Sequence, residues 1–356
     1  MSMDEKLREI LAGFPLDAPA RDCQRYGKGH INETYLVTTD SKRYILQKIS
    51  RTAFPDVEGL MENIAGVTEF LRKKDPDPRS AMHIIRTGQG RSYLQYGEEC
   101  WRMYDYVEGT VSLQAPETDR DFYESAVGFG RFISLLADYP AATLHEPIPN
   151  FHNTPDRYRI FLDVLKRDPL GRAKNVEREV AFVLEQQEEM AALQTMLSRG
   201  TLPLRVTHND TKLNNVLLDE VTHKAVCVID LDTVMPGLAA YDFGDSIRFG
   251  AATAAEDEPD LEKMTIDLGK YETYARGFVS ACQGLTREEL ASLPLGAKTM
   301  TMECGIRFLT DYLDGDHYFA IHRPGHNLDR ARTQFRLVSQ MQRRWDEMRA
   351  IIEKVR

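Results

Sequence analysis

The hydrophobic pattern of this chain predicts an antiparallel sheet in its first hundred residues. Apolar and polar positions alternate along residues 34–39 and 43–49 around a polar turn, as expected for a β-hairpin. Residues 81–96 repeat the pattern with glycines at the turn, and residues 99–109 predict one more strand. Between the two hairpins, apolar residues recur at helical spacing, which predicts one helix over residues 57–71.

Beyond residue 109 the spacing of apolar residues becomes mostly helical. It predicts helices over residues 118–138, over residues 175–198, and from about 286 to 353 with one break. Another helix is expected to begin near Thr154, which would cap it, because Pro155 suits the first helical position.

The chain is therefore predicted to be an α+β protein with two lobes. Residues 1–107 would form an N-terminal lobe, an antiparallel sheet with one helix, and residues 108–356 a mainly helical C-terminal lobe. Within the second lobe, the apolar segment KAVCVIDLD predicts a short buried strand. A chain of 356 residues is long enough for two cores, since domains average roughly 150 residues.

Composition and charge narrow the class of protein. Hydrophobic residues make up 42% of the chain and charged residues 28%, which is typical of a globular protein. The formal net charge of −10 argues against nucleic acid as the main partner. The cysteines form no CxxC pair, which favours reduced thiols and a cytoplasmic location. We expect no signal peptide, because the N-terminal segment is charged and amphipathic and has no apolar h-region. We expect no membrane partner, because no apolar run approaches ~18 residues.

The densest polar segment reads THNDTKLNNVLLD. In it, Asp210 is followed five residues later by Asn215, then by an apolar strand, a turn and the strand that ends at Asp230. This order of residues is the catalytic layout of protein-kinase-like phosphotransferases, and it predicts a protein-kinase-like two-lobe fold. Asp210 is expected to be the catalytic base that orients the acceptor hydroxyl. Asn215, Asp230 and Asp232 are the predicted oxygen ligands of Mg²⁺.

Two further residues of this segment receive roles. Lys212, two residues after Asp210, would neutralise the γ-phosphoryl oxygens as the P–O bond breaks. His208 is interpreted as a support for the loop, because Asp210 already supplies the base. The simpler interpretation is a polar hairpin whose side chains cap local backbone. The acidic pair at a strand end and the upstream sheet favour the catalytic interpretation.

The first lobe should supply groups that bind ATP. Gly27 and Gly29 lie just before a predicted strand and are candidates to cover the phosphates. They do not complete a G-x-G-x-x-G motif, and a plain β-turn explains them equally well. Lys48 lies on the following strand, where a phosphate-binding lysine is expected in this layout.

The predicted helix and the last strand of the first lobe complete the ATP site. Glu62 is our predicted ion-pair partner of Lys48, and Glu69 is the competing choice. The segment RMYDYVEG would link the lobes, and the backbone of Tyr104 and Tyr106 could bond adenine. A buried edge strand is the alternative for that segment.

Four segments carry a resemblance to a known family: HNDTKLNNVLLD, VIDLDTVMPGLAAYDFGDSIRFGA, MECGIRFLTDYLDGDHYF and RPGHNLDRARTQFRLVSQM. They resemble the aminoglycoside/choline kinase-like family of small-molecule phosphotransferases, and are most similar to its bacterial N-acetylhexosamine 1-kinases. With the first-lobe pattern, the resemblance spans most of residues 20–350. It implies that ATP and Mg²⁺ are used to phosphorylate the anomeric C1 hydroxyl of GlcNAc or GalNAc.

The resemblance also implies a sugar-binding site beside Asp210. The matching positions are His30, Phe249, Arg307, Tyr318 and Trp345. Such residues suit a neutral N-acetyl sugar, whose apolar face an aromatic ring can cover and whose hydroxyls and acetamide need hydrogen-bonding groups. Phe249 and Trp345 also fit core positions, while His30 could cap a turn and Tyr318 could pack a loop.

Two other hypotheses remain. The chain could phosphorylate another small-molecule hydroxyl, on another hexose, an aminoglycoside, homoserine or choline. An aminoglycoside would need convergent carboxylates, which only Asp311, Asp314 and Asp316 offer, and choline would need an aromatic cage, which the acceptor region does not suggest. An inactive kinase fold used as a binding module is disfavoured, because the predicted catalytic residues are all present.

Overall fold

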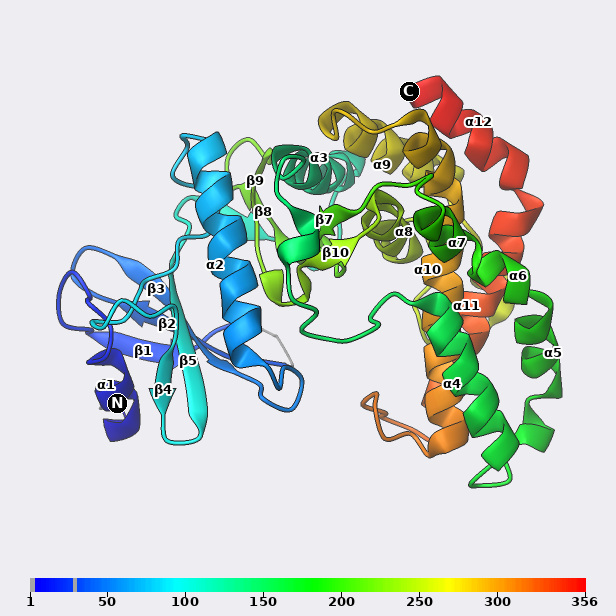
Figure 1. The fold of residues 1–356 in the computed structure, drawn as a ribbon, viewed down its shortest axis with the longest axis horizontal. Coiled ribbons are helices and arrows are strands. Elements are labelled where there is room, and N and C mark those ends of the chain that lie inside the picture. The colour runs from blue at the N-terminus through cyan, green and yellow to red at the C-terminus, as the bar shows by residue number, and fades with distance from the viewer. Residues whose placement is uncertain (1–3, 28–30) are drawn as a thin grey trace. The chain divides into compact units, whose positions relative to one another are not determined.

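The computed structural model describes residues 4–27 and 31–356 (Figure 1). The chain forms two compact units, each assembled from three segments. Unit 1 comprises Met1–Ser112, Asp138–Pro149 and Val216–Pro236. Unit 2 comprises Leu113–Ala137, Asn150–Asn215 and Gly237–Arg356. The chain thus returns to unit 1 twice, in segments that the predicted division after residue 107 does not include.

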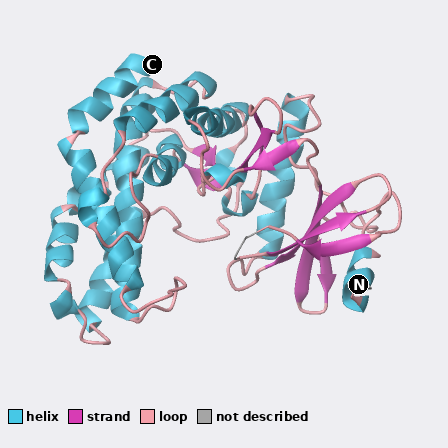
Figure 2. Cartoon of the chain, turned by 180° about the vertical axis from the view of Figure 1, so that it is seen from behind, coloured by secondary structure: helices cyan, strands magenta, loops and turns pink. Residues whose placement is uncertain are grey.

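An antiparallel sheet of five strands dominates unit 1, as the alternating pattern predicted (Figure 2). Its strands, in the spatial order β1–β2–β3–β5–β4, are β1 (Asp22–Arg25), β2 (Glu33–Thr38), β3 (Arg43–Ile49), β5 (Glu99–Asp105) and β4 (Leu94–Tyr96). The predicted hairpin over residues 81–96 is only half right. Its first arm makes isolated bridges at Ala81 and Ile84 instead of a ladder, so only β4 remains as a strand.

The two faces of this sheet carry different side chains, because successive residues of a strand point to opposite faces. On one face, Tyr44, Leu46, Trp101 and Met103 form a core with α1 (Glu5–Leu11) and the residues that follow it. Arg102 points to the other face, where its Nη1 lies 3.9 Å from the Met61 sulfur in α2 (Val57–Lys74). The predicted helix over residues 57–71 is therefore confirmed and is slightly longer.

A second, smaller sheet completes unit 1 and leads the chain to Asp230. It pairs β6 (Thr110–Ser112), β8 (Val216–Asp219) and β9 (Ala225–Val228) in antiparallel order. The chain then makes a 3-10 turn, η4 (Leu231–Thr233). Asn63 of α2 fixes this region, because its Nδ2 donates to the carbonyl oxygen of Val234 at 3.0 Å. The unit also contains the 3-10 turn η1 (Ala141–Thr143).

Unit 2 is built around one long helix, α10 (Arg287–Asp314), against which α4, α8 and α11 pack. Its other helices are α3 (Asp119–Leu135), α4 (Thr154–Arg167), α5 (Glu177–Glu185), α6 (Gln187–Met190), α7 (Ala192–Ser198), α8 (Ala239–Gly250), α9 (Leu268–Ala281), α11 (His326–Arg343) and α12 (Trp345–Val355). Shorter elements are η2 (Ala173–Asn175), β7 (Arg205–Thr207), η3 (Leu213–Asn215) and η5 (Leu261–Lys263), and β10 (Met235–Gly237) lies at the boundary of the units.

Several helix boundaries differ from the sequence prediction. Residues 175–198 form three short helices, and the final helix is interrupted at Arg344. Helix α4 begins one residue earlier than expected: Asn153 is its N-cap, with Oδ1 accepting the Asp156 N–H at 3.2 Å. At the centre of unit 2, Gly296 of α10 meets the carbonyl oxygen of Ala240 in α8, where a Cβ atom would not fit. This glycine allows the two helices to cross closely.

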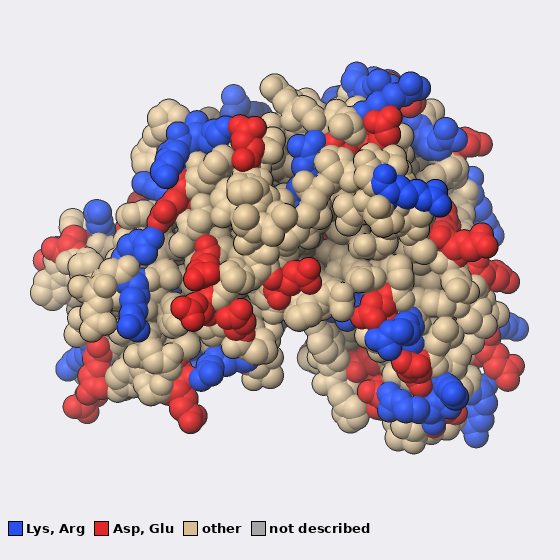
Figure 3. All heavy atoms as spheres, viewed as in Figure 1, with Lys and Arg blue, Asp and Glu red and all other residues tan. Residues whose placement is uncertain are grey.

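The surface mixes charges of both signs. On the face shown in Figure 3, groups of Lys and Arg lie beside Asp and Glu. Among the described residues, no helix has both the length and the apolar character needed to cross a membrane.

Candidate active site

The loop that carries Asp210 is fixed in unit 2 by carboxylates of α8. Asp242 accepts the backbone N–H groups of His208 and Asn209, each at 2.8 Å. Asp245, one turn later, accepts the N–H of Thr211 at 2.9 Å. The loop conformation is therefore held by its main chain. Neither aspartate was predicted from the sequence to have a role, although their i, i+3 spacing in one helix places them on the same face.

Burial and neighbouring charges shift the pKa values of these two aspartates in opposite directions. It raises the pKa of Asp242 to about 6, even though the neighbouring His208 counteracts the shift. Burial would also raise the pKa of Asp245, but the charges of Arg248 and Lys212 hold it below its usual value. The His208 ring is fully buried and packs edge-on against Phe129, with centroids 5.3 Å apart. His208 thus supports the loop, as expected.

Asp210 itself is oriented by two neighbours in the same loop. Lys212 Nζ lies 2.8 Å from Asp210 Oδ1. Asn215 Nδ2 donates to the Asp210 carbonyl oxygen at 2.8 Å and to Oδ2 at 3.3 Å. Burial alone would lower the pKa of Lys212, but the Asp210 charge raises it above its usual value. The Asp210 side chain is 28% exposed, so its carboxylate remains accessible from outside the loop.

Phe249, at the end of α8, lies beside this loop. Its ring centroid is 5.8 Å from Lys212 Nζ and 3.7 Å from the guanidinium carbon of Arg248. Phe249 is 40% exposed, so it is not a core residue. The structure therefore brings Phe249 to the catalytic loop, as the sequence resemblance implied.

Arg307 of α10 lies among three aromatic rings. Its guanidinium carbon is 5.6 Å from the ring centroids of Phe151 and Tyr318 and 5.4 Å from that of Phe319. Its Nη2 donates to the Tyr318 hydroxyl at 3.3 Å. The sequence did not suggest this aromatic cluster, because its rings come from segments far apart in the sequence. A cation, Arg307, already occupies this cluster.

A histidine whose side chain is 10% exposed connects α10, the helix of Arg307, to the Asp210 loop. His152 Nδ1 bonds Glu303 Oε1 at 2.9 Å, and its Nε2 lies 3.4 Å from the carbonyl oxygen of Asn209. Glu303 precedes Arg307 by one helical turn and also accepts the Thr154 hydroxyl at 2.7 Å. His152 therefore fixes the position of the loop relative to α10 within unit 2.

The acidic residues near the end of α10 are occupied by partners from the protein itself. Asp311 accepts the backbone N–H groups of residues 317, 318 and 319 at 2.8–2.9 Å. Asp316 pairs with Arg172 at 2.6 Å, and Asp314 with Arg167 at 3.3 Å. Asp311 thus shapes the loop that presents Tyr318. These three carboxylates do not form an open cluster.

One member of the expected sugar set, Trp345, does not join Arg307. His30 lies outside the described residues, as does Gly29. The Trp345 ring packs against Lys298, whose Nζ lies 4.4 Å from the ring centroid. Lys298 precedes Arg307 by nine residues of α10, about 14 Å along the helix axis. The structure thus places Trp345 apart from Arg307 and Tyr318.

The predicted ion pair of Lys48 with Glu62 is not formed among the described residues. Lys48 Nζ instead lies 2.9 Å from Glu33 and 3.1 Å from Glu99, on the sheet face that packs on α1. Glu62 pairs with His145 at 2.8 Å. The competing choice, Glu69, pairs with Arg86. Neither Glu62 nor Glu69 therefore pairs with Lys48.

Asp232, a predicted metal ligand, is bound to a buried arginine. Arg102 donates from Nη1 and from Nη2, the latter at 2.9 Å, to the two carboxylate oxygens. Burial alone would lower the pKa of Arg102, but Asp232 raises it above its usual value. Breaking such a pair costs about 3–5 kcal/mol, so Asp232 is poorly suited to coordinate Mg²⁺. An arginine inside the apolar strand segment CWRMY was the signal that the sequence analysis did not use.

The other predicted ATP contacts have mixed outcomes. Gly27 has φ +75°, a left-handed conformation that favours glycine. Tyr104 is buried, and the N–H of Tyr106 already donates to the Arg43 carbonyl oxygen at 3.0 Å. The Tyr106 N–H is therefore not available for adenine. Asp230 adopts a left-handed backbone, with φ 60° and ψ 57°.

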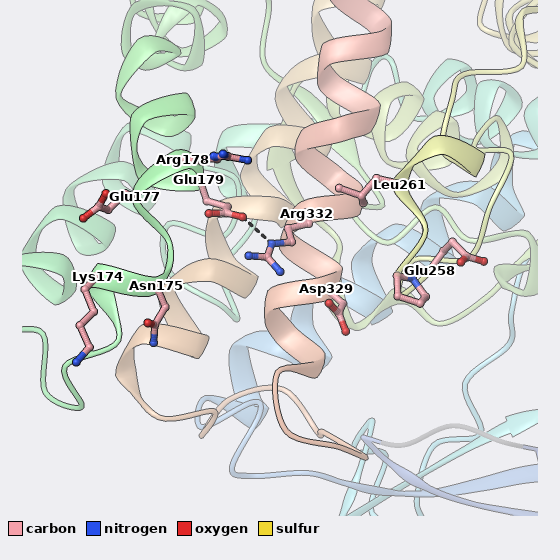
Figure 4. A pocket seen from close by; sticks show the side chains of 10 residues that line it. Lys174, Asn175, Glu177, Arg178, Glu179, Glu258, Leu261, Asp329 and Arg332 are labelled. Carbon is pink, nitrogen blue, oxygen red and sulfur yellow. Dashed lines mark hydrogen bonds and ion pairs between the residues drawn. The ribbon is translucent and has the colours of Figure 1, made fainter.

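A cavity of about 630 Å³ lies elsewhere in unit 2, between α5, α11 and the segment before η5 (Figure 4). Both signs of charge line it, and Arg332 pairs across it with Glu179 at 2.6 Å. None of the predicted site residues lines it. We therefore do not assign this cavity to the acceptor.

Comparison with known proteins identifies a family. Residues 22–277 match the model of the phosphotransferase enzyme family. A probable choline kinase from Arabidopsis thaliana is 31% identical over 160 residues, which cover 43% of this chain and 44% of that protein. The chain thus matches less than half the length of this curated relative.

Solved structures show the same fold. A microcompartment-associated aminopropanol kinase has a TM-score of 0.64 at 18% identity, covering 97% of this chain and 98% of that one. A spectinomycin phosphotransferase, solved with ADP and spectinomycin, has a TM-score of 0.58 at 12% identity, covering 99% and 97%. A choline kinase from Streptococcus pneumoniae has a TM-score of 0.55 at 13% identity, covering 95% and 98%.

Proposed function

Because the chain belongs to the phosphotransferase enzyme family, we propose that it is an ATP- and Mg²⁺-dependent N-acetylhexosamine 1-kinase. It would phosphorylate the anomeric C1 hydroxyl of GlcNAc or GalNAc. The observations that carry this proposal are two arrangements in unit 2, Asp210 with Lys212 and Phe249, and Arg307 with Tyr318. Together they supply a base, a cation beside it, aromatic surface and a hydrogen-bond donor for a neutral sugar.

In the proposed step, Asp210 accepts the proton of the C1 hydroxyl. The sugar oxygen then forms a bond to the γ-phosphorus of ATP, while the bond from that phosphorus to the bridging oxygen breaks and ADP leaves with the electron pair. The proton on Asp210 passes to solvent when the sugar 1-phosphate departs. Lys212, held 2.8 Å from Asp210, neutralises charge on the phosphoryl oxygens.

The chain has suitable donors for a magnesium ion. Asn215 uses its Nδ2 for Asp210, and over the described part of the chain its Oδ1 accepts no hydrogen bond, which leaves a hard oxygen for a cation. We propose Asn215 and Asp230 as ligands and exclude Asp232, whose oxygens serve Arg102. When bound, the ion would neutralise charge on the ATP phosphates. The described residues contain no group of three or more His, Cys, Asp or Glu side chains that could hold a metal ion.

The charges near the acceptor favour a neutral sugar over a cationic acceptor. The aromatic cluster that could bind choline surrounds the guanidinium of Arg307, which would repel a quaternary ammonium group. The carboxylates that could bind an aminoglycoside are occupied by backbone N–H groups and arginines. Arg307 can instead donate to sugar hydroxyls or to an acetamide oxygen.

A substrate panel tests the proposal. ADP release should be measured with ATP, Mg²⁺ and GlcNAc, GalNAc, choline, ethanolamine, homoserine or kanamycin as acceptor. We expect turnover with the N-acetylhexosamines and loss of the reducing end in the product. The methyl glycoside of GlcNAc is a matched control, because its C1 oxygen carries no proton. Turnover of that glycoside, or turnover of kanamycin or choline alone, would contradict the proposal.

A further inference from the structure

Unit 1 contains a buried polar network centred on Asp232. Both carboxylate oxygens accept N–H groups from Arg102, and Oδ2 also accepts from Asn32 Nδ2. The side chains of Arg102 and Asp232 are 1% and 5% exposed. Three donors therefore saturate most of this carboxylate, in a place that water barely reaches.

The network extends to three strands and their connections. Arg102 Nε donates to Gln47 Oε1 at 3.0 Å, and Gln47 Nε2 donates to the Thr34 hydroxyl at 3.0 Å. Asn32 Oδ1 accepts the backbone N–H of Ser50 at 2.9 Å. Asp232 is thus attached to β5 directly, to β3 and β2 through Arg102, and to the backbone of Ser50, just after β3, through Asn32.

Asp230 precedes this fixed point by two residues. Its left-handed backbone, at φ 60°, is unfavourable for a residue other than glycine and persists only where the surroundings impose it. Leu231 and Asp232 are buried in the following turn, η4. The geometry of this turn therefore determines where the Asp230 carboxylate points.

We propose that Arg102 is the positioning residue of the Asp230 turn and that Asp232 is its anchor, not a second metal ligand. The inference rests on the proposed function, because it takes Asp230 as a ligand of Mg²⁺. The strand register supports it: Arg102 is opposite Gln47, whereas Lys48 is opposite Trp101 and points to the α1 face. The cation that serves this turn is thus on β5, whereas Lys48 of β3, which was predicted to bind the ATP phosphates, lies on the opposite face of the sheet.

The test compares nucleotide binding with and without metal. Calorimetry of ADP binding, in excess Mg²⁺ and in EDTA, gives the factor by which Mg²⁺ tightens binding. In Arg102→Gln this factor should fall about 10- to 100-fold, the usual cost of losing a residue that orients a metal ligand. Arg79→Gln is the matched control, because Arg79 pairs with Asp219 at 3.1 Å in the same unit, outside this network. Its factor should equal that of the wild type.

A second variant distinguishes loss of the positioning role from loss of the folded state. Arg102→Met combined with Asp232→Leu removes both charges, and replacing a buried ion pair by apolar residues commonly preserves folding. We expect thermal unfolding close to wild type and the same loss of the metal effect as in Arg102→Gln. If Arg102→Gln keeps the wild-type factor while Asp232→Asn loses it, Asp232 is a ligand and the inference is wrong.

The outcomes separate this inference from the proposed function. If Mg²⁺ does not tighten ADP binding to the wild-type protein, the proposed metal-dependent activity itself fails. If the wild type shows the metal effect and every Arg102 variant retains it, only the role of Arg102 is refuted.

Discussion

The two segments that carry the predicted catalytic residues are held in different ways. The Asp210 loop of unit 2 is fixed through its main chain, whose N–H groups are accepted by Asp242 and Asp245. The Asp230 turn of unit 1 is fixed through side chains, chiefly the ion pair of Arg102 with Asp232. Main-chain bonds do not depend on which side chains the loop carries. The first segment can therefore use its side chains for chemistry, whereas the second depends on specific side-chain partners.

The largest expected effect tests the chemistry of the first segment. Asp210→Asn keeps an oxygen that can accept from Asn215 but cannot take a proton, so kcat should fall about 10²- to 10⁴-fold. Binding of ADP with Mg²⁺, measured by calorimetry, should stay within a factor of about two, since the variant changes no group that we assign to the nucleotide. An unchanged kcat would remove Asp210 as the base.

This contrast also shows which parts of the candidate site could be predicted from the sequence. Asp210, Lys212 and Asn215 lie within six consecutive positions, so their spacing alone predicted that they would meet, and they do. Phe249 and Arg307 were connected to them only by resemblance. The aromatic rings around Arg307 come from residues 151, 318 and 319, and no local pattern could bring them together.

The sheet of unit 1 was harder to predict, because both phases of β3 contain apolar residues. Tyr44 and Leu46 alternate with Ile45 and Ile49, so the pattern does not show which phase faces α1. The structure gives that face to the phase of Lys48, which explains why Lys48 pairs with Glu33 and Glu99. Arg102 and Asp232 are 130 positions apart, and their pairing needs the folded sheet.

The next effect concerns how the Asp210 loop is held. Burial raises the Asp242 pKa from 3.8 to about 6, so between these values the folded protein binds a proton that the unfolded chain has lost. This group's contribution to the free energy of unfolding is therefore fully present below about pH 4, and it is lost as pH rises through about 6. Asp242→Asn abolishes this dependence. The free energy of unfolding of the wild type should therefore exceed that of the variant by about 2–3 kcal/mol more at pH 4 than at pH 7.

Urea unfolding at the two pH values measures this difference. The matched control is Asp163→Asn, an exposed helical aspartate in the same unit, whose stability difference from the wild type should not vary by more than about 0.5 kcal/mol. A stability difference for Asp242→Asn that is independent of pH would show that Asp242 is not protonated in this range. The main-chain anchoring of the loop would then rest on a permanently charged carboxylate.

The smallest effect concerns acceptor binding. Arg307→Ala removes a charged donor from the proposed sugar site, so KM for GlcNAc should rise about tenfold, the lower end expected for a charge-assisted hydrogen bond of about 1.5 kcal/mol. KM for ATP should stay unchanged. Tyr318→Phe deletes only the hydroxyl that accepts from Arg307 at 3.3 Å, so it should raise the sugar KM by less than about threefold. Loss of ATP affinity in Arg307→Ala would move this arginine from the acceptor to the phosphates. The contrast between an acceptor region in unit 2 and a nucleotide-side turn in unit 1 would then not hold.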